Sequence, residues 1–267
     1  MRKRLRLIAE FFKIQLKGAI QYPLPYWLGF TGQIISYGST FAVIYIAVSS
    51  FGELAGWKAE EVLLLYAFEL ISYAISAFFF FHPSTRLAAR IRSGDFDASL
   101  TKPMNPFAFQ VCNYGMALGY LSHFSLALGV MIFALIRIRF NPTPLNLMIL
   151  VLFILGSSAV QGGLLVLCSV FSFKLLNSNP FINLFWMFKG FLKYPISIYG
   201  GVLQVILTVV IPFGFINFYP AQYLLSREGG FFSVRFGIIT PLVGAAILAL
   251  AYFLWMGQLK RYNSSGS

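Results

Sequence analysis

The sequence predicts an all-α integral membrane protein with six transmembrane helices, preceded by an amphipathic N-terminal helix in the membrane interface. Of the 267 residues, 58% are hydrophobic and only 10% are charged, and the mean hydropathy is +0.77. A soluble domain carries about 25% charge. Apolar stretches of roughly 20 residues, which a helix needs to cross a bilayer core of about 30 Å, recur along the chain. These observations exclude a soluble fold.

Residues 1–22 predict the interfacial helix. Four cations recur at helical spacing on one face, and four large apolar residues line the opposite face, which is typical of a helix lying at headgroup level. The cations are Arg2, Arg6, Lys13 and Lys17, and the apolar residues are Leu5, Ile8, Phe12 and Leu16. A simple positive flank before the first span is the alternative interpretation.

Six apolar segments are long enough to be the spans. They comprise residues 27–50, 62–81, 107–136, 145–171, 196–218 and 237–256. Residues 181–192 are also apolar, but this segment is short and is followed by Lys193 and Pro195. We therefore expect it to lie in the interface or to re-enter the membrane from one side.

The distribution of cations predicts the orientation. With the N-terminus inside, 15 of the 20 lysines and arginines fall in cytoplasmic segments, namely the start, residues 82–106, residues 174–193 and the C-terminal end. The positive-inside rule favours this arrangement. We expect a multi-pass protein of the inner (plasma) membrane with both termini cytoplasmic, in which residues 1–262 form one transmembrane domain and residues 263–267 a flexible tail.

Several functional classes lack their required residues. The net charge of +12 is spread in short clusters between apolar runs, which fits contact with membrane lipids and gives no basis for binding nucleic acid. The chain has no G-x-x-x-x-G-K-[ST] loop for ATP, no clustered metal ligands and no G-x-S-x-G nucleophile motif. We therefore expect no catalytic residues, no metal site and no cofactor in this chain.

Residues 82–106 form the most informative segment. They read as two short helices, with Gly94 suited to the left-handed position at the end of the first. At this loop the sequence resembles the membrane subunits of type-2 ATP-binding-cassette (ABC) transporters, which often carry I-x-x-G-x-x-D-x-x-L-x-[KR]-P-x-N-P here. The matching residues are Ile91, Gly94, Asp97, Leu100, Lys102, Pro103, Asn105 and Pro106. The N-terminal elbow helix, the six-span plan and residues 194–199 and 218–221 extend the resemblance over most of the chain.

The resemblance implies that this loop is a coupling helix that docks into a cleft of a cytosolic ATPase. The residues expected to couple are Arg86, Arg90, Ile91, Arg92, Gly94, Asp95, Asp97 and Leu100. It also implies two ATPase subunits, which hold the ATP and Mg, and a second permease subunit, either another copy or a related chain. The alternative is that these residues only shape a cytoplasmic turn.

Four polar residues within the predicted spans are candidates for a translocation path: Glu69, Tyr73, His123 and Gln161. A charge at mid-bilayer is costly, so we expect Glu69 to pair with a neighbour, to be protonated or to face a hydrated pathway. A packing role is the alternative for all four.

The resulting expectation is the permease subunit of an ABC exporter. The aromatic content of 18% with few charges inside the spans favours an amphipathic or lipid-like substrate. The main alternative is an autonomous proton-coupled transporter that uses Glu69 or His123. A membrane-embedded lipid enzyme and a non-transporting scaffold are further alternatives.

Overall fold

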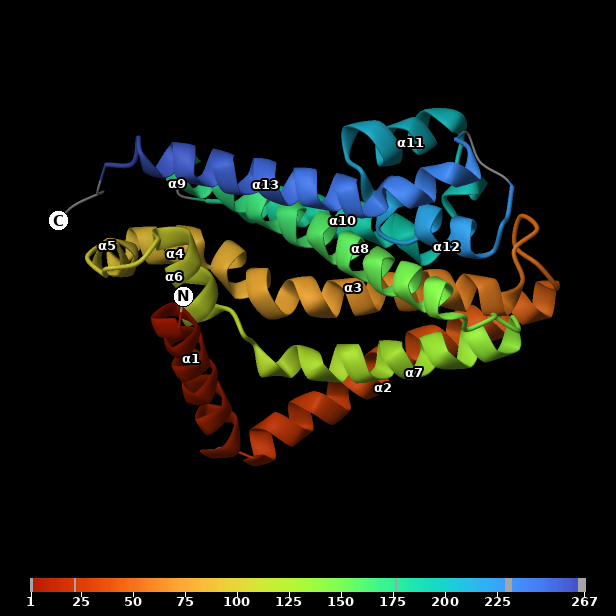
Figure 1. The fold of residues 1–267 in the computed structure, drawn as a ribbon, viewed down its shortest axis with the longest axis horizontal. Coiled ribbons are helices and arrows are strands. Elements are labelled where there is room, and N and C mark those ends of the chain that lie inside the picture. The colour runs from red at the N-terminus through yellow and green to blue at the C-terminus, as the bar shows by residue number, and fades with distance from the viewer. Residues whose placement is uncertain (1, 22, 176, 229–231, 264–267) are drawn as a thin grey trace.

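A computed structural model shows the protein as a bundle of long helices (Figure 1). It describes all residues except 1, 22, 176, 229–231 and 264–267, and it describes only the backbone of residues 2–8 and 19. Within this part of the chain every regular element is helical, and Leu54 and Trp57 form an isolated bridge. The all-α prediction agrees with this architecture.

Thirteen α-helices are present among the described residues. They are α1 (Arg2–Gln21), α2 (Pro23–Phe51), α3 (Ala59–Thr85), α4 (Leu87–Arg92), α5 (Asp95–Leu100), α6 (Pro106–Tyr114), α7 (Leu121–Arg137), α8 (Pro144–Val170), α9 (Ser172–Leu175), α10 (Asn179–Gly190), α11 (Gly201–Val205), α12 (Phe218–Leu224) and α13 (Thr240–Leu259). Of these described helices, α2, α3, α7, α8 and α13 provide the five segments that are long and apolar enough to cross a membrane.

The prediction of six spanning helices is not confirmed, because residues 196–218 do not form one helix. They are divided among a 3₁₀ turn, α11, a π-helical turn (Ile206–Val210) and a second 3₁₀ turn. Pro212 has no backbone N–H to continue the helix, and Ile211 before it is extended at φ −127° and ψ 95°. Apolar length alone does not show these breaks, although a proline inside an apolar segment favours a kink.

The short apolar segment at residues 181–192 forms most of helix α10 and the turn after it, and its location in the interface or re-entering the membrane stays a prediction. Helix α10 packs along α8 and continues into a 3₁₀ turn that packs on α3. The Asn217 side-chain amide donates to the carbonyls of Leu192 (2.6 Å) and Leu65 (3.2 Å), and so ties the end of this segment to α3. Lys193 therefore lies towards the end of the bundle at which α3 begins.

The third predicted span is interrupted near its start. Residues 107–136 are divided into α6 and α7 by an irregular turn in which Met116 has φ 55°. A Cβ at Gly115 would lie 2.5 Å from the carbonyl oxygen of Phe79, so glycine allows this turn to press against α3. The Ala117 amide then donates to the Phe78 carbonyl at 3.1 Å.

Helix α3 lies at the centre of the bundle. In its most apolar window 83% of the residues are buried, against 17% in α2 and 22% in α13. Helices α7 and α8 form the most extensive contacts with it, and α2 adds a further contact. This cover keeps the polar side chains of α3, among them Glu69 and Ser72, away from lipid.

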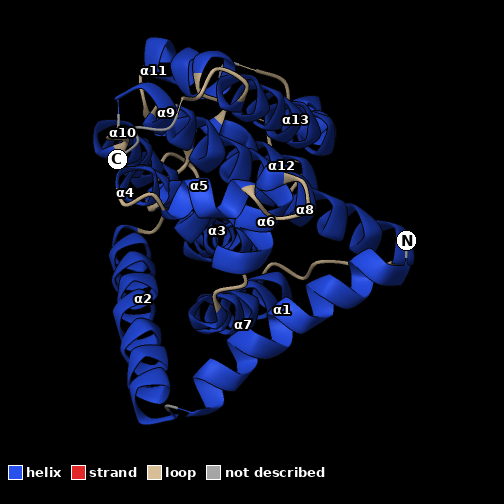
Figure 2. Ribbon diagram, turned by 90° about the vertical axis from the view of Figure 1, so that its left-hand side faces the viewer, coloured by secondary structure: helices blue, strands red, loops and turns tan. Residues whose placement is uncertain are grey.

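Helix α1 lies across one end of the bundle. Figure 2 shows α3 and α7 nearly end-on, whereas α1 is seen along its length. The Gln15 side chain donates to the Asn113 carbonyl at 3.2 Å and Phe11 packs edge-on against Phe109, so α1 is held on α6. The described N- and C-terminal segments lie at the same end of the bundle as α4 and α5 (Figure 1). A location of α1 in the membrane interface remains a prediction.

Glycines allow α8 and α13 to approach each other closely. A Cβ at Gly156 would lie 2.7 Å from the Cα of Pro241, and a Cβ at Gly244 would collide with the Gly156 carbonyl oxygen. This pair of helices has the most extensive contact in the described bundle. Small residues at such crossings are the usual basis of tight packing between membrane helices.

We expect Gly244→Leu to destabilise the bundle by about 1 to 3 kcal/mol, because its side chain must push two backbones apart. Thermal unfolding in detergent, followed by size-exclusion chromatography, measures the change. The matched control is Gly257→Leu on the same helix, where a Cβ meets nothing within 4 Å. Equal stability of the two variants would show that the α8–α13 contact can relax.

Candidate functional site

The predicted coupling loop is a rigid pair of short helices. Helix α4 ends at Arg92 and α5 begins at Asp95, and Gly94 between them has φ 78°. Only glycine adopts this left-handed conformation without strain, so it fixes the angle between the two helices. At the far end of the loop, Asn105 caps α6 by accepting a hydrogen bond from the Ala108 amide at 3.0 Å.

Apolar side chains attach α4 and α5 to the bundle. Leu87, Ile91 and Phe96 are all fully buried. They form a cluster with Val166 of α8 and with Trp255 of α13. The loop is thus packed on two long helices, and a displacement of the loop has to displace them as well.

Arg90 fastens the loop to α3 and α6. Its guanidinium donates to the carbonyls of His82 (2.7 Å) and Pro83 (3.0 Å), and to the side-chain oxygen of Gln110 (3.0 Å). It also lies 3.8 Å from the ring centroid of Tyr114. Several charge-assisted hydrogen bonds on one buried cation are individually strong, so this residue acts as a structural anchor.

The predicted coupling residues therefore divide into two groups. Arg86, Arg92, Gly94 and Asp95 are exposed, and Asp97 and Leu100 are half-buried. Arg90 and Ile91 are buried, so they attach the loop to the bundle, and the coupling role of the whole set stays a prediction. The exposed charges lie at the extreme end of the bundle, where Figure 1 shows α4 and α5.

A second polar group lies in the centre of the bundle. The Glu69 carboxylate of α3 forms an ion pair with the Lys189 ammonium of α10, and their side chains are only 3% and 10% exposed. The same ammonium lies 4.2 Å from the ring centroid of Tyr73, one helical turn from Glu69. Of the three environments expected for Glu69, the structure shows pairing with a neighbour.

The other candidates for a path surround this ion pair. Gln161 of α8 donates to the Glu69 carbonyl at 3.0 Å and to the Ser72 hydroxyl at 2.6 Å. His123 of α7 lies on the other side, with its ring centroid 4.5 Å from that of Tyr37 and 6.0 Å from that of Tyr73. All four residues named from the sequence thus gather around α3, between α7, α8 and α10.

Lys189 is the member of this site that the sequence reasoning missed. The positive-inside count places it among the cytoplasmic cations, because the short apolar length of its segment predicts a location in the interface or a re-entrant path. The useful signal was a lone lysine inside an apolar helix, in a chain with a lone intramembrane glutamate. Lys189 and Lys193 therefore do not lie with the cations at the α4–α5 end of the bundle.

The described residues contain no group of three or more His, Cys, Asp or Glu side chains that could hold a metal ion. The two cysteines, Cys112 and Cys168, are both free thiols. What the site offers is a buried ion pair within a polar network at the centre of the bundle, together with a fastened, charged loop at one end.

Comparison with known proteins identifies the family. A family model described as "ABC-2 family transporter protein" matches residues 34–266. The chain belongs to this family. A search of curated proteins gave no match, and a search of solved structures gave none either. Members of the ABC-2 membrane family are permease components, generally not catalytic themselves, that work with ABC ATPase subunits. The resemblance at residues 82–106 is therefore confirmed at the level of the family.

In this ABC-2 protein we expect removal of either partner of the central ion pair to destabilise the fold by about 3 to 5 kcal/mol, because the other charge stays buried without compensation. The variants are Glu69→Gln and Lys189→Met, compared with the double variant in a thermodynamic cycle. The double variant should recover much of the loss. Strictly additive losses would contradict a direct interaction between the two charges.

We also expect Arg90→Met to loosen the loop while the long helices persist, since the hydrogen bonds to α3 and α6 disappear. Limited proteolysis within residues 86–106 should become several-fold faster. Arg92→Met, at an exposed position on the same helix, is the control. Equal cleavage rates in the two variants would show that Arg90 does not anchor the loop.

Proposed function

We propose that this chain is the membrane-spanning subunit of an ATP-driven exporter, which pairs with a second permease chain and binds two separate cytosolic ATPase subunits through α4 and α5. The ATP and Mg belong to those partners. The observation that carries the proposal is the firm attachment of a short charged helix pair to the long helices of an ABC-2 family protein.

The contacts of the loop support its role in coupling. The exposed face carries Arg92 and Asp95, charges that suit contact with a partner of complementary charge. The opposite face is packed on α8 and α13, and Arg90 holds the end of α3. A force applied to α4 and α5 by closing ATPases would therefore reach three long helices at once.

The central ion pair gives this movement a place to act. Glu69 and Lys189 join α3 to α10, and Gln161 joins α3 to α8. A change in the relative positions of these helices has to preserve or exchange the polar contacts, which favours two discrete arrangements over continuous deformation. In this proposal the two arrangements open the path to opposite sides of the membrane.

An amphipathic or lipid-like cargo fits the residues around the ion pair. Tyr73, Trp186 and His123 place aromatic surfaces beside the one buried charge pair found in the described bundle. Such a mixture suits a molecule with both apolar and polar parts. We also place both termini and the α4–α5 loop on the cytoplasmic side of the plasma membrane, which agrees with their common end of the bundle.

The decisive experiment is a mild-detergent purification of the chain from its native host, followed by mass spectrometry of the bound soluble proteins. We expect to recover a bound ATPase whose sequence contains a phosphate-binding loop with its lysine. The double variant Arg92→Glu with Asp95→Arg should lose this subunit, since both side chains are exposed on the docking face.

The control is Arg235→Glu, which changes an exposed charge after α12. It should retain the ATPase at the wild-type level. Consistent purification of the folded chain without an ATPase in several detergents would contradict the proposal and favour an autonomous carrier. Loss of the ATPase in both variants would show that α4 and α5 are not the specific docking surface.

A further inference from the structure

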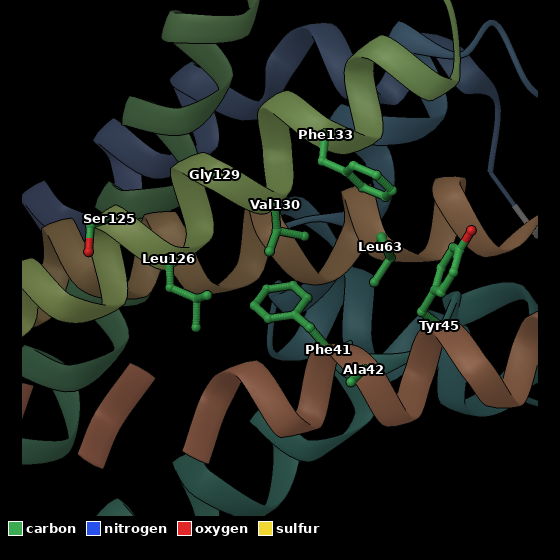
Figure 3. Close-up of a pocket in the computed structure, with 9 residues that line it drawn as sticks. All are labelled: Phe41, Ala42, Tyr45, Leu63, Ser125, Leu126, Gly129, Val130 and Phe133. Carbon is green, nitrogen blue, oxygen red and sulfur yellow. The ribbon is translucent and has the colours of Figure 1, made fainter. Parts of the chain in front are cut away.

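An apolar groove opens between α2, α3 and α7, with a volume of about 370 Å³ (Figure 3). Figure 3 shows side chains from α2 and α7 that face one another across it. The wall includes Phe41 and Tyr45 of α2, Leu63 of α3, and Gly129, Val130 and Phe133 of α7. None of the residues that line it carries a charge.

A glycine keeps the middle of this groove open. A Cβ added at Gly129 would meet no heavy atom within 4 Å. Most residues around it carry aliphatic or aromatic side chains. An open apolar groove on a membrane protein is filled most favourably by a hydrocarbon chain, because water there would find few hydrogen-bond partners.

An arginine lies at one end of the groove, and a second arginine follows it in the sequence. The Arg137 guanidinium is 5.3 Å from the ring centroid of Phe133, which itself lines the wall. Arg139 follows two residues later, and both side chains are exposed. Neither arginine forms a salt bridge with another residue in the described part of the chain. They are therefore available to bind an anion.

The length of the groove matches one leaflet of a bilayer. Along α7 the backbone rises by about 12 Å from Ser125 to Phe133, and Arg137 lies about one turn further. Half of a hydrocarbon core of about 30 Å is about 15 Å. Arg137 is the last residue of α7, so we expect it to lie near the level of the phosphate headgroups.

We propose that this groove holds an acyl chain of an anionic phospholipid, whose phosphate is bound by Arg137 and Arg139. The lipid would connect α2 to α7, two helices whose surfaces are otherwise largely exposed. This inference does not depend on the proposed export function, because it requires neither an ATPase nor a moving cargo.

Photochemical labelling tests the proposal. The full chain is placed in phosphatidylcholine nanodiscs that contain a minor fraction of phosphatidylglycerol with a diazirine near the end of one acyl chain. After illumination, labelled peptides are mapped by mass spectrometry. We expect labels to concentrate on residues 41–45 and 125–133. The labelling yield there should be well above the yield on the exposed face of α13.

Two sets of variants separate the acyl chain from the headgroup. Gly129→Leu should fill the groove and abolish the enrichment, whereas Gly257→Leu should leave it unchanged, as neither new Cβ meets a neighbour within 4 Å. Arg137→Gln and Arg139→Gln should each reduce the preference for phosphatidylglycerol over phosphatidylcholine by about fivefold.

Labels spread evenly over the exposed helices, or enrichment that persists in Gly129→Leu, would overturn the proposal. If a diazirine-bearing phosphatidylcholine labelled the groove as strongly as the phosphatidylglycerol probe does, the assigned role of the arginines would be overturned. Cysteines placed at Val130 and Ala42 that cross-link to a second copy of the chain would assign the groove to an interface between permeases and would also exclude the lipid.

Discussion

The polar side chains of α3, Glu69 above all, have to be kept away from lipid, and this requirement constrains the helices around it. Helices α2 and α7 cover one side, and α8 and α10 cover the other. The same burial removes Glu69 from solvent, and Lys189 of α10 supplies the cation that compensates its charge.

The sequence allows reliable prediction of those elements whose determinants are local. Apolar length locates α2, α3, α8 and α13 within a few residues, and Gly94 marks the turn between α4 and α5. The break at Gly115 was missed because hydropathy averages over single residues, whereas this break depends on one backbone position. The pairing of α10 with α3 through Lys189 was missed because it depends on tertiary packing.

The candidate sites show the same distinction. Glu69, Tyr73, His123 and Gln161 could be selected individually as polar residues in apolar segments, but their common location depends on tertiary packing. Within the loop, the sequence separates charged from apolar residues and cannot show that Arg90 points inward. A cation is normally expected on a surface, and the carbonyl groups at the end of α3, together with Gln110 and Tyr114 of α6, explain its burial.

The order of synthesis gives the Glu69–Lys189 pair a consequence for membrane insertion. Helix α3 leaves the ribosome long before α10, so its carboxylate enters the apolar phase when no counter-ion exists. Until α10 arrives, that carboxylate has to be protonated, hydrated or held beside the insertion machinery. The central helix therefore reaches its final environment late, and a chain that stops before Lys189 exposes an incomplete bundle to quality control. The last third of the protein completes the core that the first third begins.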